Sequence, residues 1–248
     1  MDENTILKLN KINNDFYSTV ATDFDDSRQY FWEGWKKLIH YTKDFNQLKS
    51  ADIGCGNGRF FEFLIKNIPK AEISYLGIDN NEDLLKFAKN NFKKNNFDNY
   101  QLKKIDIIES LLSKNDFLKE DQKLQTNDGF NLIVSFGVMH HIPSYKLRLQ
   151  LISYLKSKIS DNGYIILSLW QFMEFERFRK KVVNYNNFEE NDYILDWNRG
   201  KKALRYCHFI DEVEQNNLIF DSKLKLVERF RADGKEGNVN TYLVLKKQ

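Results

Sequence analysis

Apolar residues in the first part of the chain recur every three or four positions, the spacing of one face of a helix. The recurring positions are Ile6, Leu9, Ile12, Phe16 and Val20. A second apolar face follows, made of Trp32, Trp35, Leu38 and Ile39. The pattern predicts that residues 4–45 are helical and that residues 1–45 form an N-terminal extension. We interpret the two tryptophans as core side chains rather than as a platform for stacking bases.

The segment between residues 48 and 170 alternates short apolar runs with helical patterns. Four of these runs, each predicted to be a strand, cover residues 73–78, 100–105, 130–136 and 164–170. This alternation indicates right-handed βαβ units, so we expect an α/β domain with helices on both faces of a mostly parallel sheet. Pro143 is typical of the first turn of the helix after residue 136, and Asn162-Gly163 is predicted to end that helix.

The other segments are less regular. Residues 107–129 are polar and predict a loop or a short helix. Residues 171–204 are charged and aromatic, and we expect them to form an insertion that faces a substrate. A last helix is predicted over residues 209–220, and residues 225–231 and 240–246 predict a closing antiparallel hairpin. We expect residues 1–248 to form a single domain.

A glycine-rich turn is the clearest sign of a binding site. Gly54, Gly56 and Gly58 are three of the chain's 11 glycines, and they lie within five residues, between an apolar run and a helical pattern. Glycine lets the backbone turn sharply and lets a ligand approach closely. The helix after the turn presents unpaired N–H groups to that ligand.

Acidic residues at the ends of predicted strands narrow the choice of ligand. Asp79 follows the glycine turn by about 20 residues, where a carboxylate can accept hydrogen bonds from ribose hydroxyls. Asp106 ends the third run, where it can meet an adenine amino group. The third glycine comes one residue too early for the dinucleotide fingerprint, and Asp52 before the turn suits an ammonium group. Ribose, adenine and an amino acid together point to S-adenosylmethionine.

At these motifs the chain resembles the class I S-adenosylmethionine-dependent methyltransferases. The matching segments are Asp52-Ile53-Gly54-Cys55-Gly56-Asn57-Gly58, Gly77-Ile78-Asp79, Ile105-Asp106 and Ser135-Phe136-Gly137-Val138-Met139-His140-His141. The resemblance implies a Rossmann-like, seven-stranded sheet. It also implies a set of cofactor-binding residues, namely Arg28, Asp52, Gly54, Cys55, Gly56, Asn57, Gly58, Asp79, Asn80, Asp106, Ile107, Phe136, Gly137 and His140.

Outside the core, the chain is similar to the tRNA wobble-uridine carboxymethyl methyltransferases. The similarity is carried by residues 16–32, 139–141, 166–171 and 205–209. It implies esterification of a carboxymethyl group on tRNA wobble uridine or a related nucleoside, with Arg205, Tyr206 and His208 positioning the substrate. Some members of that branch need a small zinc-binding partner protein. Two alternatives stay open, a small-molecule O- or N-methyltransferase and a non-catalytic cofactor-binding module that regulates a partner.

Composition sets further bounds. The formal net charge of +3 gives no strong overall attraction to nucleic acid, and the clusters at 177–181 and 201–202 are interpreted mainly as solvated faces. Cys55 and Cys207 have no metal-ligand spacing, so we expect neither a metal site nor a disulfide framework. An acidic, polar start and the lack of a long apolar run predict a cytoplasmic protein without a membrane segment.

Overall fold

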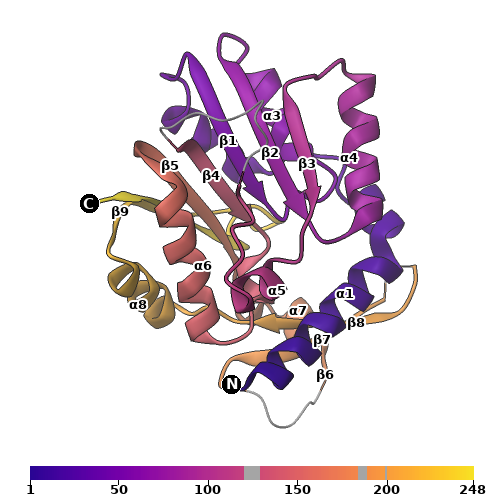
Figure 1. Ribbon diagram of the computed structural model, residues 1–248. Coiled ribbons are helices and arrows are strands. Elements are labelled where there is room, and N and C mark those ends of the chain that lie inside the picture. Colours follow the sequence, from indigo (N-terminus) through magenta and orange to yellow (C-terminus); the bar gives the residue numbers. More distant parts are fainter. Residues whose placement is uncertain (120–128, 184–188, 199) are drawn as a thin grey trace.

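The computed structural model describes residues 1–119, 129–183, 189–198 and 200–248. Its larger sheet has seven strands in the order β3-β2-β1-β4-β5-β10-β9 (Figure 1). The strands are β1 (Gln47–Ile53), β2 (Glu72–Asp79), β3 (Tyr100–Lys104), β4 (Phe130–Phe136), β5 (Ile159–Trp170), β9 (Leu224–Ala232) and β10 (Asn240–Lys247). The first five run parallel, whereas β10 is antiparallel to both β5 and β9. This confirms the mostly parallel sheet and its closing antiparallel hairpin.

Helices cover both faces of this sheet, as predicted. One face carries α2 (Glu33–Leu38), α3 (Arg59–Asn67) and α4 (Glu82–Lys94). The other carries α5 (Ile107–Leu112), α6 (Tyr145–Lys158) and α8 (Glu212–Ser222). Side chains of a strand alternate between the faces, so Leu132 and Val134 join one apolar core while Ile133 joins the other. No described helix has both the length and the apolar character needed to cross a bilayer.

Two predicted helix boundaries were wrong. Pro143 precedes helix α6 instead of opening its first turn, because Ser144 caps the helix and accepts a hydrogen bond from the Leu147 N–H. Asn162-Gly163 lies inside β5, since α6 already ends at Lys158 and Ile159 pairs with Phe130 of β4. The register shifts there, and a side chain at Gly163 would meet the Phe130 carbonyl oxygen at 2.7 Å.

The N-terminal extension is helical but broken. Helix α1 (Glu3–Asp26) crosses the carboxyl ends of the parallel strands in Figure 1. Helix α2 and a 3-10 turn, η1 (Ile39–Tyr41), follow after an irregular link over residues 27–32. Trp35 is buried in the core as expected, whereas Trp32 is only partly buried.

The segment expected to be an insertion contains a second sheet. After η3 (Phe172–Glu174) and α7 (Glu176–Arg179), three antiparallel strands follow: β6 (Val182–Val183), β7 (Asp192–Trp197) and β8 (Ala203–His208). The sheet therefore extends to residue 208, past the predicted boundary at 204. Residues 120–128 of the predicted 107–129 segment, and residues 184–188 and 199 of the insertion, lie outside the described residues.

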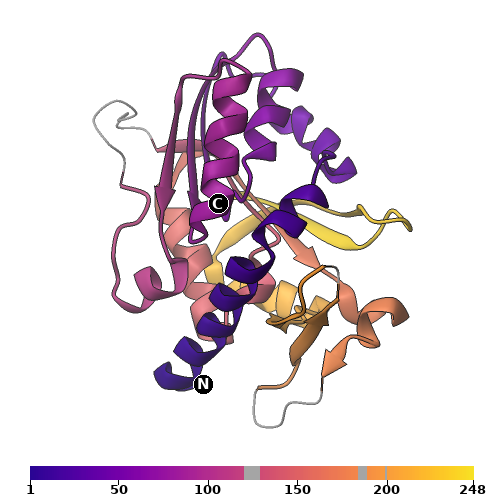
Figure 2. The same ribbon diagram turned by 90° about the vertical axis from the view of Figure 1, so that its right-hand side faces the viewer.

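Helix α1 and the small sheet pack together as one layer, which we call the cap. Leu9 contacts Ile194 and Tyr206, while Phe16 and Val20 pack on Trp197. Figures 1 and 2 both place this layer at the carboxyl ends of the parallel strands. Most of the regularly spaced apolar residues of α1 therefore pack against the small sheet.

A buried charged cluster fastens the cap to the rest of the domain. His208 of β8 is bonded through Nδ1 to Asp192 at 2.7 Å and through Nε2 to Glu214 of α8 at 2.6 Å. Glu214 also accepts from the Arg148 Nε of α6 at 2.6 Å. Burial lowers the pKa of His208, but the two carboxylates outweigh burial and raise it above its ordinary value.

We expect His208→Gln to destabilise the fold most strongly at acidic pH. Folding raises the pKa of His208, so the histidine contributes fully below its unfolded pKa, about 6.5, and loses that contribution as pH rises through the folded pKa. Urea unfolding of both proteins from about pH 5.5 to about pH 9 measures the difference. If the difference in unfolding free energy between the two proteins instead grew with pH, the His208 ring would be neutral in the folded state.

Candidate functional site

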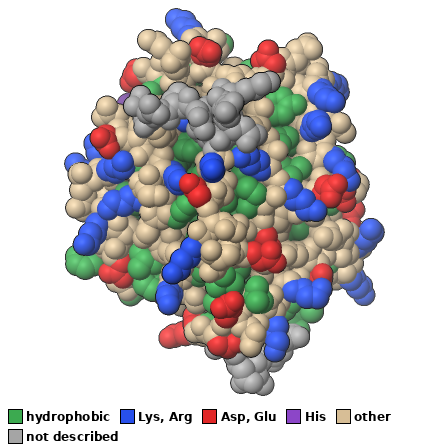
Figure 3. All heavy atoms as spheres, viewed as in Figure 1, with side chains coloured by type: hydrophobic (Ala, Val, Ile, Leu, Met, Phe, Trp, Pro, Cys, Tyr) green, Lys and Arg blue, Asp and Glu red, His purple; other side chains and the backbone are tan. Residues whose placement is uncertain are grey.

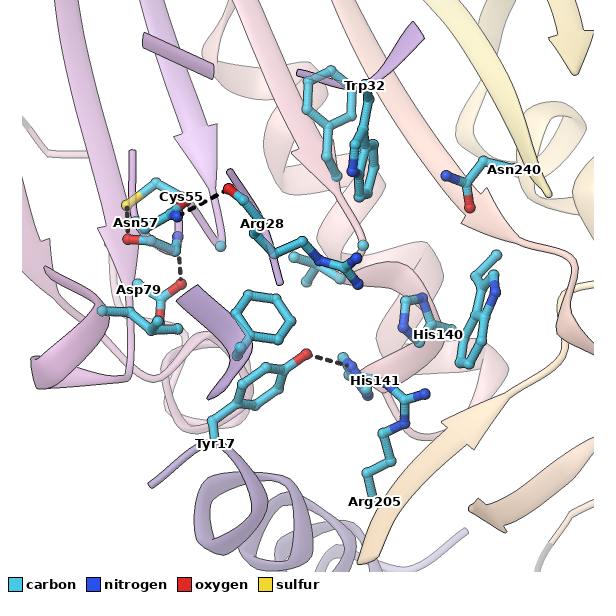
Figure 4. A pocket seen from close by; sticks show the side chains of 18 of the residues that line it. Tyr17, Arg28, Trp32, Cys55, Asn57, Asp79, His140, His141, Arg205 and Asn240 are labelled. Carbon is cyan, nitrogen blue, oxygen red and sulfur yellow. Dashed lines mark hydrogen bonds between the residues drawn. The ribbon is translucent and has the colours of Figure 1, made fainter. Parts of the chain in front are cut away.

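A cavity of 780 Å³ lies between the carboxyl edge of the large sheet and the cap. Its walls come from the ends of β1, β2 and β4, from α1 and the α1–α2 link, and from the small sheet (Figure 4). A cavity of this size can hold a nucleoside-sized cofactor together with part of an acceptor. Most of the sequence-predicted site residues line it.

The glycine turn forms the floor of the cavity. Gly54 and Cys55 donate backbone hydrogen bonds to the Ile78 carbonyl at 2.8 and 2.9 Å, so the turn is held against the end of β2. Gly56 has a φ of +54°, and a side chain there would enter open space, which leaves room for a ligand. Gly58 does not line the cavity, because it starts α3 with a φ of +78° and packs against Phe92.

Asp79 lies beside this floor. Its Oδ2 accepts from the Gly56 N–H and its Oδ1 from the Asn81 N–H, each at 2.8 Å. Burial raises the pKa of this carboxyl, while those N–H groups partly offset the effect. Each oxygen keeps a lone pair for a hydroxyl group of a ligand, and Asn80 lines the cavity next to it.

Asp106 and Ile107 also line the cavity, but the Asp106 carboxylate is already heavily used. One oxygen caps α5 by accepting from the N–H groups of Ile108 and Glu109. The other accepts from the side-chain amides of Asn10 and Asn14, at 2.8 and 3.0 Å. An adenine amino group could therefore donate to Asp106 only by replacing the hydrogen bond from Asn10 or Asn14 of α1.

Asp52 and Arg28 lie at other parts of the wall. Asp52 accepts a hydrogen bond from the Tyr75 hydroxyl at 2.7 Å, and burial raises its pKa to about 7. Arg28 follows α1, with its guanidinium over Phe24. Asn57 ties this region to the glycine turn by donating to Asp25 at 2.7 Å. Cys55 is buried in the turn beside them.

The end of β4 supplies Phe136, Gly137 and, in the turn η2 (Met139–His141), His140. The Gly137 N–H donates to the Ser168 hydroxyl at 2.9 Å, which fixes the turn against β5. His140 is buried, and its Nδ1 has no hydrogen-bond partner among the described residues. Burial holds the pKa of His140 well below its ordinary value, so the ring is neutral.

Arg205 is the most unusual residue of the wall. Its guanidinium lies over the rings of Trp170, Phe16 and Trp197, at 4.6, 5.4 and 5.7 Å from their centroids. Arg205 is 8% exposed, and among the described residues its Nε has no hydrogen-bond partner and no carboxylate pairs with it. A buried cation without an anion is costly, so this position suits an anionic ligand.

Tyr206 and His208, the other two predicted substrate-positioning residues, do not line the cavity. Successive side chains of a strand point to opposite faces, and Arg205 and Cys207 point away from the face that carries Tyr206 and His208. The Tyr206 hydroxyl instead donates to Asp192 at 2.6 Å, and His208 joins the charged cluster described above. Of the three, only Arg205 can meet a ligand in this arrangement.

His140, His141 and Cys207 form a buried cluster that linear spacing did not reveal. Their potential ligand atoms lie within 4.8 Å of one another. Both nitrogens of His141 are engaged, Nδ1 with the Tyr206 carbonyl at 2.8 Å and Nε2 with the Tyr17 hydroxyl at 2.9 Å. A metal ion would have to break one of these contacts, so the cluster fits a hydrogen-bonding role better.

Charge is divided across the cavity. Asp52, Asp79 and Asp106 lie toward the large sheet, whereas the cap side and the β9–β10 turn contribute cationic residues. These cationic residues are Arg177, Lys181, Arg205 and Lys235. Arg28 and Arg59 also line the cavity, and Asp233 adds an acidic residue in the β9–β10 turn. On the face shown in Figure 3, by contrast, basic and acidic side chains are interspersed. The cavity therefore offers both carboxylates and cationic groups to a ligand.

Helix α1 supplies wall residues that the sequence reasoning missed, namely Asn10, Asn13, Asn14 and Tyr17. The sequence contains a sign of this wall, because these polar residues interrupt the apolar face of the helix. Without knowledge of where α1 packs, that signal could not be assigned to a site. Trp32 also lines the cavity, next to Gly137.

Comparison with known proteins identifies relatives. The model of a family described as "Methyltransferase domain" matches residues 45–207. The human "Probable tRNA methyltransferase 9B" is 22% identical over 184 residues, which cover 74% of this chain and 32% of that protein. The chain therefore spans about a third of the length of that relative.

Solved structures share the fold. An S-adenosylmethionine-dependent methyltransferase from Clostridium acetobutylicum has a TM-score of 0.62 at 13% identity, with 95% of this chain and 98% of that chain covered. Magnesium protoporphyrin IX methyltransferase from Synechocystis, solved with bound SAH, has a TM-score of 0.59 at 14% identity, with 100% of both chains covered.

We expect Asp79→Ala to weaken S-adenosylmethionine binding about 10- to 100-fold, because it removes a charged hydrogen-bond acceptor and loosens the Gly56 turn. Isothermal titration calorimetry measures this loss. Glu82→Ala, an exposed change on the adjacent helix, serves as the matched control and should leave affinity unchanged. Equal affinity of wild type and Asp79→Ala would remove Asp79 from the cofactor site.

Asp52 should make S-adenosylmethionine binding depend on pH. Its pKa of about 7 means that the carboxylate is mostly protonated below neutrality and ionised above it. Affinity for a ligand with an ammonium group should therefore rise, by up to about tenfold, between about pH 6 and about pH 8. The same titrations with Asp52→Asn should show a flatter profile. A matching profile in both proteins would assign the titration to another group.

Proposed function

The chain belongs to the methyltransferase domain family, and we propose that it uses S-adenosylmethionine to esterify a carboxylate on its acceptor, namely the carboxymethyl group of a tRNA wobble uridine. The proposal of a carboxylate acceptor rests on Arg205, a buried cation in the cavity wall that pairs with no anion among the described residues. The motif order at both ends of the chain and the tRNA methyltransferase relatives support the choice of tRNA.

The cavity fits the cofactor. The open space at Gly56 lets the cofactor approach the backbone of the glycine turn closely. Asp79 has lone pairs for the ribose hydroxyls, and Asp52 suits the ammonium group. When bound, S-adenosylmethionine supplies a methyl group on a positively charged sulfur. The protein then needs only to hold the acceptor in line with that methyl group and exclude water.

No general base is needed for a carboxylate acceptor, because a carboxylic acid is already ionised at neutral pH. The described titratable groups around Arg205 agree with this, since their pKa values lie far from neutrality. Burial raises the pKa of Tyr17 and of Cys207 to about 12, and it lowers the pKa of His141 to about 3. Arg205 itself can grip one or both carboxylate oxygens through its planar fork of donors.

The rim of the cavity also favours a polyanionic acceptor. Arg177 and Lys181 of the insertion and Lys235 of the β9–β10 turn line the cavity, and Arg177 is paired there with Glu236. Such residues can meet phosphates on either side of a nucleoside that enters the cavity. Two partners are part of this proposal, a tRNA and, as in some related enzymes, a small activating subunit.

A small carboxylic acid is the second candidate acceptor. Trp170, Trp197 and Phe178 surround the acceptor end of the cavity with aromatic rings, which can enclose an apolar molecule. Transfer of labelled methyl groups to a ribonuclease-treated metabolite extract, with none to tRNA, would favour this reading. Binding of the cofactor with no transfer to any acceptor would instead indicate a regulatory module.

We expect Arg205→Gln to reduce methyl transfer to tRNA by about two orders of magnitude in kcat/KM, while S-adenosylmethionine affinity changes less than about threefold. The assay follows labelled methyl transfer to tRNA with and without the carboxymethyl group. Lys202→Gln, an exposed change directly before β8, is the control. Transfer that is unaffected by Arg205→Gln, or independent of the carboxymethyl group, would refute the proposed acceptor.

A further inference from the structure

The hydroxyl proton of Tyr17 has a fixed direction. The Nδ1 of His141 lies 2.8 Å from the Tyr206 carbonyl oxygen, which can only accept, so Nδ1 carries a proton. The His141 ring is buried with Arg205 nearby, and it is therefore neutral. Its Nε2 then holds a lone pair, so the Tyr17 hydroxyl, 2.9 Å away, must donate to it.

This chain of hydrogen bonds leaves the Tyr17 oxygen with lone pairs only. Tyr17 lines the cavity, so a ligand meets an acceptor at this point and never a donor. The ring is held in place by edge-to-face contacts with Phe16, Phe24 and His141, at centroid distances of 5.0, 5.5 and 5.6 Å. The acceptor is therefore pre-positioned.

Figure 4 shows the Tyr17 hydroxyl between Asp79 on one side and Arg205 and His140 on the other. Asp79 marks the nucleoside end of the cavity, and Arg205 marks the acceptor end. The group that is transferred must lie between the two ends. A lone-pair oxygen in this gap is matched to a cationic group with polarised C–H bonds, the features of a methyl group on sulfonium.

We propose that the Tyr17 oxygen contacts the sulfonium methyl group of S-adenosylmethionine, and that the site thereby favours the methylated cofactor over its demethylated product, S-adenosylhomocysteine. The inference rests on the proposed function for the identity of the cofactor and for the acceptor end. The product is a neutral thioether that has lost both the charge and the methyl group. The contact is thus available before transfer and lost after it.

Tyr17 also offsets an unfavourable charge. Arg205 on the neighbouring strand is cationic and close enough to shift the pKa values of Tyr17 and His141. A sulfonium beside it would be repelled. The oxygen of Tyr17, with its proton turned toward His141, presents negative partial charge toward that sulfonium.

The test compares two ligands on two proteins. Calorimetry with S-adenosylmethionine and with S-adenosylhomocysteine gives the ratio of their affinities for wild type and for Tyr17→Phe, which keeps the ring and removes only the oxygen. We expect the variant to bind S-adenosylmethionine about three- to tenfold more weakly, with unchanged binding of S-adenosylhomocysteine. Tyr154→Phe, whose hydroxyl bonds to Asp116 outside the cavity, is the matched control.

A second variant tests the direction of the proton. His141→Phe removes the acceptor at Nε2 and frees the Tyr17 proton to turn into the cavity, so the affinity ratio should fall in the same direction. Thermal unfolding of each variant checks that the fold is kept.

Each other outcome has a defined meaning. Equal weakening of both ligands by Tyr17→Phe would place Tyr17 at a part that the two share, and an unchanged ratio would remove it from the site; either result overturns the inference. Wild type that binds neither ligand would instead overturn the proposed function. Normal ligand discrimination without transfer to tRNA would affect only the choice of acceptor.

Discussion

The hydrogen bonds from Gly54 and Cys55 to the Ile78 carbonyl hold the end of β1 against the end of β2. They depend on the parallel register that pairs Ile53 with Ile78. With this junction in place, Asp79 accepts from the Gly56 N–H, and the turn opens toward the cavity. The other walls are then added around this point, from β4 on one side and from the cap above. The position of the cavity walls therefore depends on the backbone hydrogen bonds at this junction.

The cap is joined to this edge by polar contacts as well as by apolar ones, such as those of Leu195 with Phe172. Its apolar side chains pack mostly within the cap, where Phe16 meets Trp197 and Leu9 meets Ile194. Toward the large sheet it presents the amides of Asn10 and Asn14 and the hydroxyl of Tyr17. Such contacts leave a cavity with polar walls between the two layers. The cap thus shapes the site without filling it.

Sequence reasoning could find what depends on local order. The glycine turn and Asp79 follow from strand ends in one βαβ unit, and the closing hairpin follows from its own pattern. Arg205 was predicted to position a substrate, and it lines the cavity. Tyr206 and His208 were predicted to have the same role, but side chains alternate along a strand, so these two point to the other face. The wall contributed by α1 depends on contacts across more than 90 residues, such as Asn14 with Asp106. No local pattern specifies that pairing.

The saturated carboxylate of Asp106 creates thermodynamic linkage between the N-terminal helix and the nucleoside end of the cavity. An adenine amino group that reaches this carboxylate competes with Asn10 and Asn14, so its binding free energy includes the loss of an amide contact from α1. The coupling is reciprocal, because whatever holds α1 down must weaken such a ligand by the same factor. A ligand that took this contact would therefore loosen the attachment of α1.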